Sequence, residues 1–198
     1  MTNFNWGGTG MPKIFLLPMI ICVLFSSGLW ASPAFGQEAV VSGSIVPLKI
    51  GDRVPDDFWT EEHLFYVDGD TVRMTLEKYK GKLLVLDFWM VGCSNCFFHQ
   101  KEINYFKTLY SNELAVVMVN GVKTKNDYNG IHRFLKGDWV TGLGLTSLSS
   151  IIESSYLDNL FNPGAYPAYY WINRQGIVQT ITFRNLLDRD YRAPFLDN

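Results

Sequence analysis

A strand, a helix and a second strand follow one another between residues 83 and 119, and this order constrains the fold more than any other feature. Residues 83–88 (LLVLDF) are apolar on both alternating faces except for one aspartate, which is typical of a strand buried in a parallel sheet. Residues 94–110 place apolar side chains on one side of a helix, and residues 114–119 (LAVVMV) form a second apolar run. The sequence therefore predicts a right-handed βαβ unit.

Segments after this unit complete the predicted sheet. Residues 168–172 and 177–183 are largely apolar and are joined by Asn173-Arg174-Gln175-Gly176, which predicts an antiparallel hairpin. Helices are predicted near 126–135 and near 147–160. A parallel unit followed by an antiparallel hairpin indicates an α/β fold with a mixed sheet flanked by helices.

The segment before the unit adds little regular structure. Pro55 lies among turn-forming residues and excludes a central strand there. Residues 76–82 predict a short helical turn closed by Gly81. Residues 37–50 show no core pattern and are interpreted as an irregular lead-in, so the folded domain is predicted to span 51–198.

The beginning of the chain, residues 1–36, is predicted to be a signal peptide. Lys13 precedes the apolar run 14–25, and a polar stretch then ends in Ala34-Phe35-Gly36, a small-x-small cleavage site. The apolar run is shorter than the about 20 residues that span a bilayer. A start at Met11 would give an ordinary signal peptide, whereas an uncleaved leader would tether the protein to the membrane. We therefore expect export to the periplasm or cell envelope.

Export leaves Cys93 and Cys96 as the cysteines of the remaining chain, because Cys22 is removed with the signal. Disulfides that stabilise secreted domains close long loops, and a four-residue loop contributes little. The pair lies where the buried strand ends and the helix begins, and unpaired backbone N–H groups there favour a thiolate. Cys93 is predicted to be the attacking sulfur, and Cys96, one turn deeper, to resolve the mixed disulfide.

Two other residues near the pair leave alternatives open. Asp87 lies in the apolar strand, where a carboxyl is costly unless it is used; burial would raise its pKa and suit it to exchange a proton with Cys96. Alternatively, strand twist brings Asp87 to the sheet edge beside a lysine. The Tyr166-Pro167 bond precedes a strand, where both cis and trans forms occur.

Together these motifs resemble a known family. Leu86-Asp87-Phe88-Trp89, then Cys93-x-x-Cys96, a Tyr-Pro before a strand and a glycine hairpin are similar to thioredoxin-like domains. Gly51-Asp52-x-x-Pro55-Asp56 resembles the opening of the exported TlpA/ResA-like thiol–disulfide oxidoreductases. The resemblance covers about residues 49–184 and implies a protein-disulfide oxidoreductase without a cofactor.

The resemblance also implies roles for individual residues. It implies that Asp87 is the family's buried acid and that Pro167 is the cis-proline packed against the disulfide. Tyr166 would then offer its backbone to a substrate peptide. The stretch between Asn120 and Pro167 is similar to the insertion that the exported members carry before the strand of the cis-proline.

Four features depart from the family pattern. Gly92 stands where thioredoxins often have a tryptophan, and His99 stands where the exported reductants often have a glutamate. Ser94-Asn95 replaces the common Gly-Pro dipeptide and leaves the direction of exchange open. Residues 185–198 hold only a short helical stretch before Pro194, where the family has a full helix, so the C-terminal helix is predicted to be incomplete or replaced.

The expected partners follow from the resemblance and from composition. The family favours a reductant of protein or peptide disulfides that receives electrons from a membrane donor. We assign Trp89 and Phe97 to an apolar rim that binds polypeptide, together with Tyr166 and Pro167, and Phe98 lies beside them. The net charge is −2 and no basic stripe is visible, which excludes nucleic acid as a partner, and we expect a monomer.

A metal carrier is the competing hypothesis. Cys93 and Cys96, with His99 one turn further along the helix, would offer three of the ligands that zinc or copper takes. The sequence lacks a second paired motif, so we predict no resident metal. His99 is then a partly exposed helix residue that tunes the thiols electrostatically.

Overall fold

The computed structural model describes residues 46–145 and 147–190. The predicted signal peptide, most of the lead-in and residues 191–198 lie outside these ranges. Within them, no helix has the length and apolar character that a membrane span requires. Residues 185–190 contain no helix, and the remainder of the predicted C-terminal helical stretch lies outside the described part of the chain.

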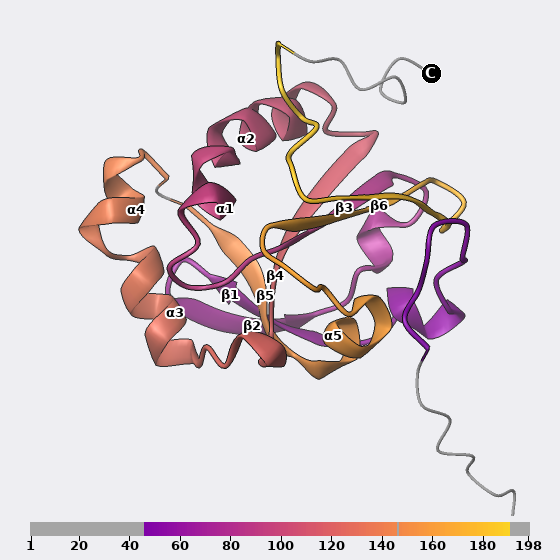
Figure 1. Ribbon diagram of the computed structural model, residues 1–198, viewed down its shortest axis with the longest axis horizontal. Helices are drawn as coiled ribbons and strands as arrows, with labels where there is room; N and C mark the ends of the chain where they lie inside the picture. The colour runs from indigo at the N-terminus through magenta and orange to yellow at the C-terminus, as the bar shows by residue number, and fades with distance from the viewer. Residues whose placement is uncertain (1–45, 146, 191–198) are drawn as a thin grey trace, which may run out of the picture. The chain divides into compact units, whose positions relative to one another are not determined.

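The described residues form one mixed sheet of seven strands in the order β2-β1-β5-β4-β3-β6-β7 (Figure 1). The central strands β3, β4 and β5 run parallel, whereas β6 lies antiparallel beside β3, β7 beside β6, and β1 beside β5. The predicted βαβ unit and hairpin are both confirmed. The strands are β1 (His63–Val67), β2 (Asp70–Met74), β3 (Leu83–Phe88), β4 (Leu114–Gly121), β5 (Ser149–Ser154), β6 (Ala168–Ile172) and β7 (Val178–Thr182).

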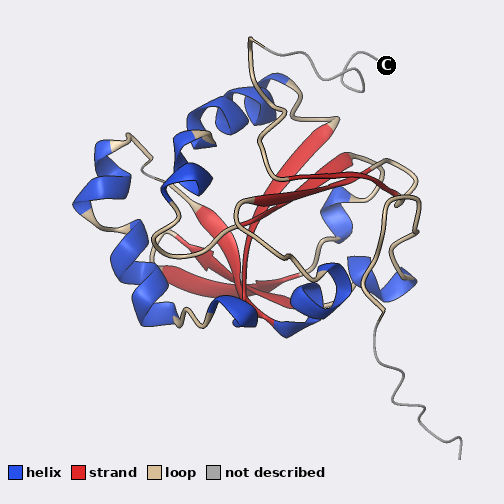
Figure 2. Cartoon of the chain, viewed as in Figure 1, coloured by secondary structure: helices blue, strands red, loops and turns tan. Residues whose placement is uncertain are grey.

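Helices and short 3-10 turns flank the sheet (Figure 2). The helix predicted over residues 94–110 is present as two helices, because His99 ends the first and begins the second. The α-helices are α1 (Ser94–Phe98), α2 (Gln100–Leu109), α3 (Tyr128–Leu135), α4 (Asp138–Gly142) and α5 (Ser155–Phe161). The 3-10 turns are η1 (Asp56–Trp59), η2 (Glu77–Tyr79), which confirms the predicted turn before Gly81, and η3 (Val122–Thr124).

The helix predicted over residues 147–160 was wrong in its first part, which forms strand β5. Residues 149–154 are extended, and the helix begins only at Ser155. Ile151 pairs with Val119 of β4 on one side and with Phe65 of β1 on the other. Pairing on both edges therefore overrides the helical pattern of the local sequence, as tertiary context commonly does.

The two faces of the sheet bury separate clusters of apolar side chains. On one face Leu84, Leu86 and Phe88 of β3 pack against η1 and α5. On the other face Leu83 and Val85 of the same strand pack against α2, while α1, α3 and α4 cover the part of the sheet formed by β1, β4 and β5. All six residues of β3 are buried, as its uninterrupted apolar run predicted.

A buried carboxylate on α5 forms a hydrogen bond with η3, the turn that directly follows β4. Asp158 is fully buried, and its Oδ2 atom accepts a hydrogen bond of 2.7 Å from the backbone N–H of Lys123. A Cβ atom on Gly121 would lie only 2.1 Å from Oδ1 of Asp158. Gly121 is therefore required for space and not for its backbone conformation.

Replacing Gly121 with alanine should force the Asp158 carboxylate out of place and lower the free energy of unfolding by about 2 kcal/mol. Urea denaturation measures this loss. Gly142→Ala is the matched control, because a Cβ there has no atom within 4 Å, and it should leave stability within about 0.5 kcal/mol. The Gly121→Ala penalty should shrink in an Asp158→Ala background; an equal penalty there would show that the carboxylate is not its cause.

Candidate active site at the Cys93–Cys96 disulfide

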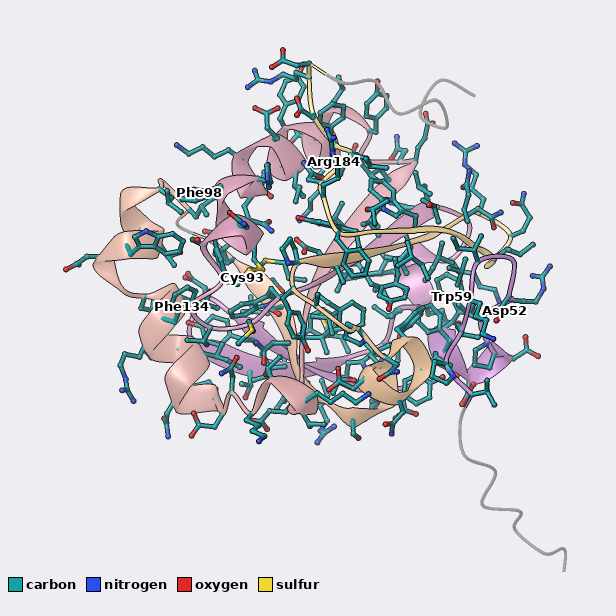
Figure 3. The ribbon with its side chains drawn as sticks, viewed as in Figure 1. Asp52, Trp59, Cys93, Phe98, Phe134 and Arg184 are labelled. Atoms are coloured by element: carbon teal, nitrogen blue, oxygen red, sulfur yellow. A yellow bond between two sulfur atoms is a disulfide. The ribbon has the colours of Figure 1, made fainter. Side chains whose placement is uncertain are left out.

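Cys93 and Cys96 are joined by a disulfide at the first turn of α1, with an S–S distance of 2.11 Å (Figure 3). Cys93 is half-buried and Cys96 is completely buried, as predicted for an attacking and a resolving sulfur. Cys93 is the N-cap of α1, and its Sγ atom accepts the backbone N–H of Cys96 at 3.2 Å. The same N–H would stabilise a thiolate on Cys93 after reduction.

The loop that leads to Cys93 is held by amide side chains from the end of β4 and the segment after it. Asn126 accepts the backbone N–H of Val91 at 2.9 Å, and Asn120 donates to the carbonyl of Trp89 at 3.2 Å. The two amides are themselves hydrogen-bonded at 3.2 Å. Gly92 then turns the chain with a φ of +84°, a conformation that favours glycine over the tryptophan that thioredoxins often have there.

Asp87 is completely buried on β3, between β4 and β6, so it does not lie at the sheet edge. Its Oδ2 atom accepts a hydrogen bond of 2.7 Å from Nε2 of Gln100. Burial raises the pKa of Asp87 to about 7, although the Gln100 hydrogen bond and the positive charge of Lys107 both act to lower it. A carboxyl with this pKa can both take up and release a proton near neutral pH.

The Tyr166–Pro167 segment lies at the same end of the sheet. The peptide bond is cis, as the family resemblance implied, and Pro167 is buried while Tyr166 is half-buried. Phe88 pairs with Ala168, which places the end of the strand leading to Cys93 beside the start of the strand that follows Pro167. Tyr166 also packs against the cluster that contains both cysteines.

Trp89 and Phe97 are core residues, and their assignment to an exposed rim was wrong. Their exposed fractions are 0% and 1%, and the Trp89 indole N–H donates to Ser150 at 2.8 Å. Both side chains belong to a buried cluster formed by β1, β4, β5, α3 and α4, in which the Phe134 ring of α3 packs against each of them. Of the three aromatic residues near the pair, only Phe98 is exposed, at 56%.

The metal hypothesis named Cys93, Cys96 and His99 as ligands, and in this structure the two sulfurs are bonded to each other. Across residues 46–145 and 147–190, no group of three or more His, Cys, Asp and Glu side chains lies close enough to hold a metal ion. His99 is exposed, as predicted. His132 lies elsewhere, with its Nδ1 atom 3.2 Å from the Tyr66 hydroxyl.

Gln100, Asn120 and Asn126 were missed by the sequence analysis. Asn120 carries a weak signal, because it is a polar residue at the end of an otherwise apolar buried strand. Gln100 and Asn126 carry none, since an amide side chain on a helix or in a loop is most often a solvated surface residue.

Comparison with known proteins adds evidence on the fold. No protein-family model matches the chain. The thioredoxin-like protein YneN of Bacillus subtilis is 24% identical over 109 residues, which are 55% of this chain and 61% of that protein. The chain thus matches about three fifths of the length of this curated relative.

Two solved structures have a similar backbone. The thioredoxin domain of a thiol-disulfide oxidoreductase from Bacteroides vulgatus is 14% identical, with a TM-score of 0.50 over 70% of this chain and 91% of that one. AhpC of Enterococcus faecalis is 17% identical, with a TM-score of 0.51 over 71% of this chain and 83% of that one. With the mixed sheet, the cysteine pair at a helix start and the cis-proline, these similarities establish that the chain has a thioredoxin-like fold.

Proposed function

We propose that this protein is a protein thiol–disulfide oxidoreductase. The observation that carries the proposal is the disulfide between a half-buried and a buried cysteine at the start of α1. A loop closed between residues three positions apart contributes little to stability, so reversible exchange explains the pair better than a structural role does. The buried acid Asp87 is connected to the Cys96 backbone through Gln100, and Tyr166 packs against the cluster that contains the pair.

In the proposed reaction the Cys93 thiolate attacks one sulfur of a substrate disulfide. A mixed disulfide forms, the substrate S–S bond breaks, and the first substrate sulfur leaves as a thiolate that takes a proton. The Cys96 thiol then gives its proton to Asp87, and its sulfur attacks Sγ of Cys93. The second substrate sulfur leaves, so the substrate gains two electrons and the cysteine pair loses two.

The substrate is proposed to be a protein or peptide that contacts the exposed side of the pair. Tyr166, half-buried before Pro167, is proposed to offer its backbone to an extended substrate segment. Trp89 is buried and takes no part in this contact. Phe98 and Trp139, with rings 5.9 Å apart and exposed fractions of 56% and 42%, are proposed to supply the apolar surface instead.

We further propose that the protein acts as a reductant after export. The predicted signal peptide and the TlpA/ResA-like opening at residues 51–56 support a role in the periplasm or cell envelope, with electrons supplied by a membrane donor. We propose a monomer, tethered to the membrane if the leader is not cleaved.

An equilibrium redox titration of residues 37–198 in glutathione or dithiothreitol buffers tests both the activity and its direction. We expect a reversible two-electron transition that is absent from Cys93→Ser protein. A midpoint of about −270 mV would support a reductant, and one of about −120 mV would contradict that direction. Absence of a reversible transition, or co-purification of a metal that blocks the thiols, would overturn the oxidoreductase proposal in favour of the metal carrier.

A further inference from the structure

Gln100 links the buried acid to the resolving cysteine. It is the first residue of α2, and only 2% of it is exposed. Its Nε2 atom lies 2.7 Å from Oδ2 of Asp87 and 3.1 Å from the backbone carbonyl of Cys96. One amide nitrogen therefore spans the acid on β3 and the backbone of α1.

The chemistry of these contacts determines which way the amide points. A backbone carbonyl can only accept, so the NH₂ group, and not the amide oxygen, must face Cys96. Both hydrogens of that group are then used, one on each acceptor. A donor fixed in this way binds an ionised carboxylate more strongly than a neutral carboxylic acid.

The two carboxylate oxygens of Asp87 consequently differ in their hydrogen bonding. Oδ2 is occupied by Gln100, whereas Oδ1 is buried and has no hydrogen-bond partner among the described residues. A proton that arrives at Asp87 therefore finds its free position on Oδ1. Without Gln100 neither oxygen would have a hydrogen-bond partner among the described residues, so no hydrogen bond would distinguish the two.

The other groups that face Asp87 come from three elements. The positive charge of Lys107 on α2 acts to lower the pKa of Asp87. Tyr169 on β6 pairs with Asp87 across the two strands, and burial, together with the Asp87 charge, raises the pKa of its hydroxyl. The neighbour on β4 is the uncharged Met118. Gln100 is the hydrogen-bond donor in this set.

We propose that Gln100 is a positioning residue for proton transfer: it holds the Asp87 carboxyl so that Oδ1 exchanges the proton with Cys96, and it favours the ionised form that accepts that proton. The inference rests on the proposed function, because it assigns Asp87 as the base in the exchange. The bond to the Cys96 carbonyl further ties the orientation of the acid to the backbone of the cysteine that it serves.

The test follows the protonation of Asp87 directly, by ¹³C NMR titration of its carboxyl carbon in the oxidised full chain. The resonance is identified by its loss in Asp87→Asn protein. Gln100→Met removes both hydrogen bonds at similar length and should raise the titration midpoint by about one pH unit. Gln100→Glu keeps the shape but adds a second carboxyl, and it should raise the midpoint further. Lys101→Met, at the exposed neighbouring position, should leave the midpoint unchanged.

The pH profile of the exchange rate with glutathione disulfide should move with the NMR midpoint in the same order. A merely structural role for Gln100 would alter stability without ordering the midpoints in this way. If Gln100→Met and Gln100→Glu both titrate as the unmodified protein does while exchange continues, the positioning role is overturned and the proposed function stands. If the unmodified protein does not exchange with any disulfide, the function itself fails and the positioning role with it.

Discussion

Reduced Cys96→Ser protein is expected to stop at the mixed disulfide, whereas reduced Cys93→Ser protein is expected to form almost none. The difference follows from burial, because Cys93 is half-exposed at the helix start and Cys96 is completely covered. The backbone N–H of Cys96 also points to the Cys93 sulfur, where it stabilises a thiolate. Either substitution should lower the rate of complete turnover by at least about 10³-fold, since each removes a sulfur that the cycle needs.

Intact mass spectrometry after exposure to glutathione disulfide distinguishes the two variants. Cys96→Ser protein should carry one glutathione per chain, and dithiothreitol should remove it. Protein with Cys93→Ser provides the control for adventitious reaction at the remaining thiol. Equal labelling of the two variants would show that the cysteines are not divided into an attacking and a resolving sulfur.

Asp87→Asn is expected to make the protein more stable at neutral and alkaline pH while it slows exchange. In the unfolded chain Asp87 ionises near its ordinary pKa of 3.8, whereas in the folded protein burial raises that pKa to about 7. Between these values the folded protein holds a proton that the unfolded chain has lost. The free energy of unfolding therefore falls as the pH rises through this range, by roughly 4 kcal/mol in all, and asparagine removes that loss.

Urea unfolding at intervals between pH 4 and pH 8, on the oxidised protein, measures this difference. The advantage of Asp87→Asn over the unmodified protein should be small at the acidic end and should grow until the pH passes about 7. Asp188→Asn serves as a control for a half-buried carboxyl outside the site. A constant difference between Asp87→Asn and the unmodified protein across this range would mean that Asp87 titrates normally in the fold.

Most of the sheet was predictable because its central strands are unusually simple. Strands β3 and β4 are buried at every position, and an uninterrupted apolar run has few alternatives when a helix separates it from a second one. The hairpin β1–β2 was missed although Asp68-Gly69 is a recognised signal for a two-residue hairpin turn. Strand β5 is different, since it depends on partners at both edges that local sequence does not reveal.

The site was predictable where chemistry depends on spacing and unpredictable where it depends on burial. The cysteine pair and the acid could be identified because their positions relative to a strand end carry meaning. The burial of Trp89 and Phe97 could not, because they are covered by residues distant in sequence, Phe134 among them. The role of Gln100 was equally hidden, since only the fold brings its amide to the acid.

The loop that leads to Cys93 is held by side chains from another part of the chain, and this has a consequence for substitutions between the two cysteines. Asn120 and Asn126 hold the backbone before Cys93, while the intervening Ser94 and Asn95 are both solvent-exposed. The dipeptide between the two cysteines therefore lies apart from the contacts that hold the loop. Substitutions at these two exposed positions are therefore expected to change the surface between the cysteines while altering the free energy of unfolding by no more than about 0.5 kcal/mol.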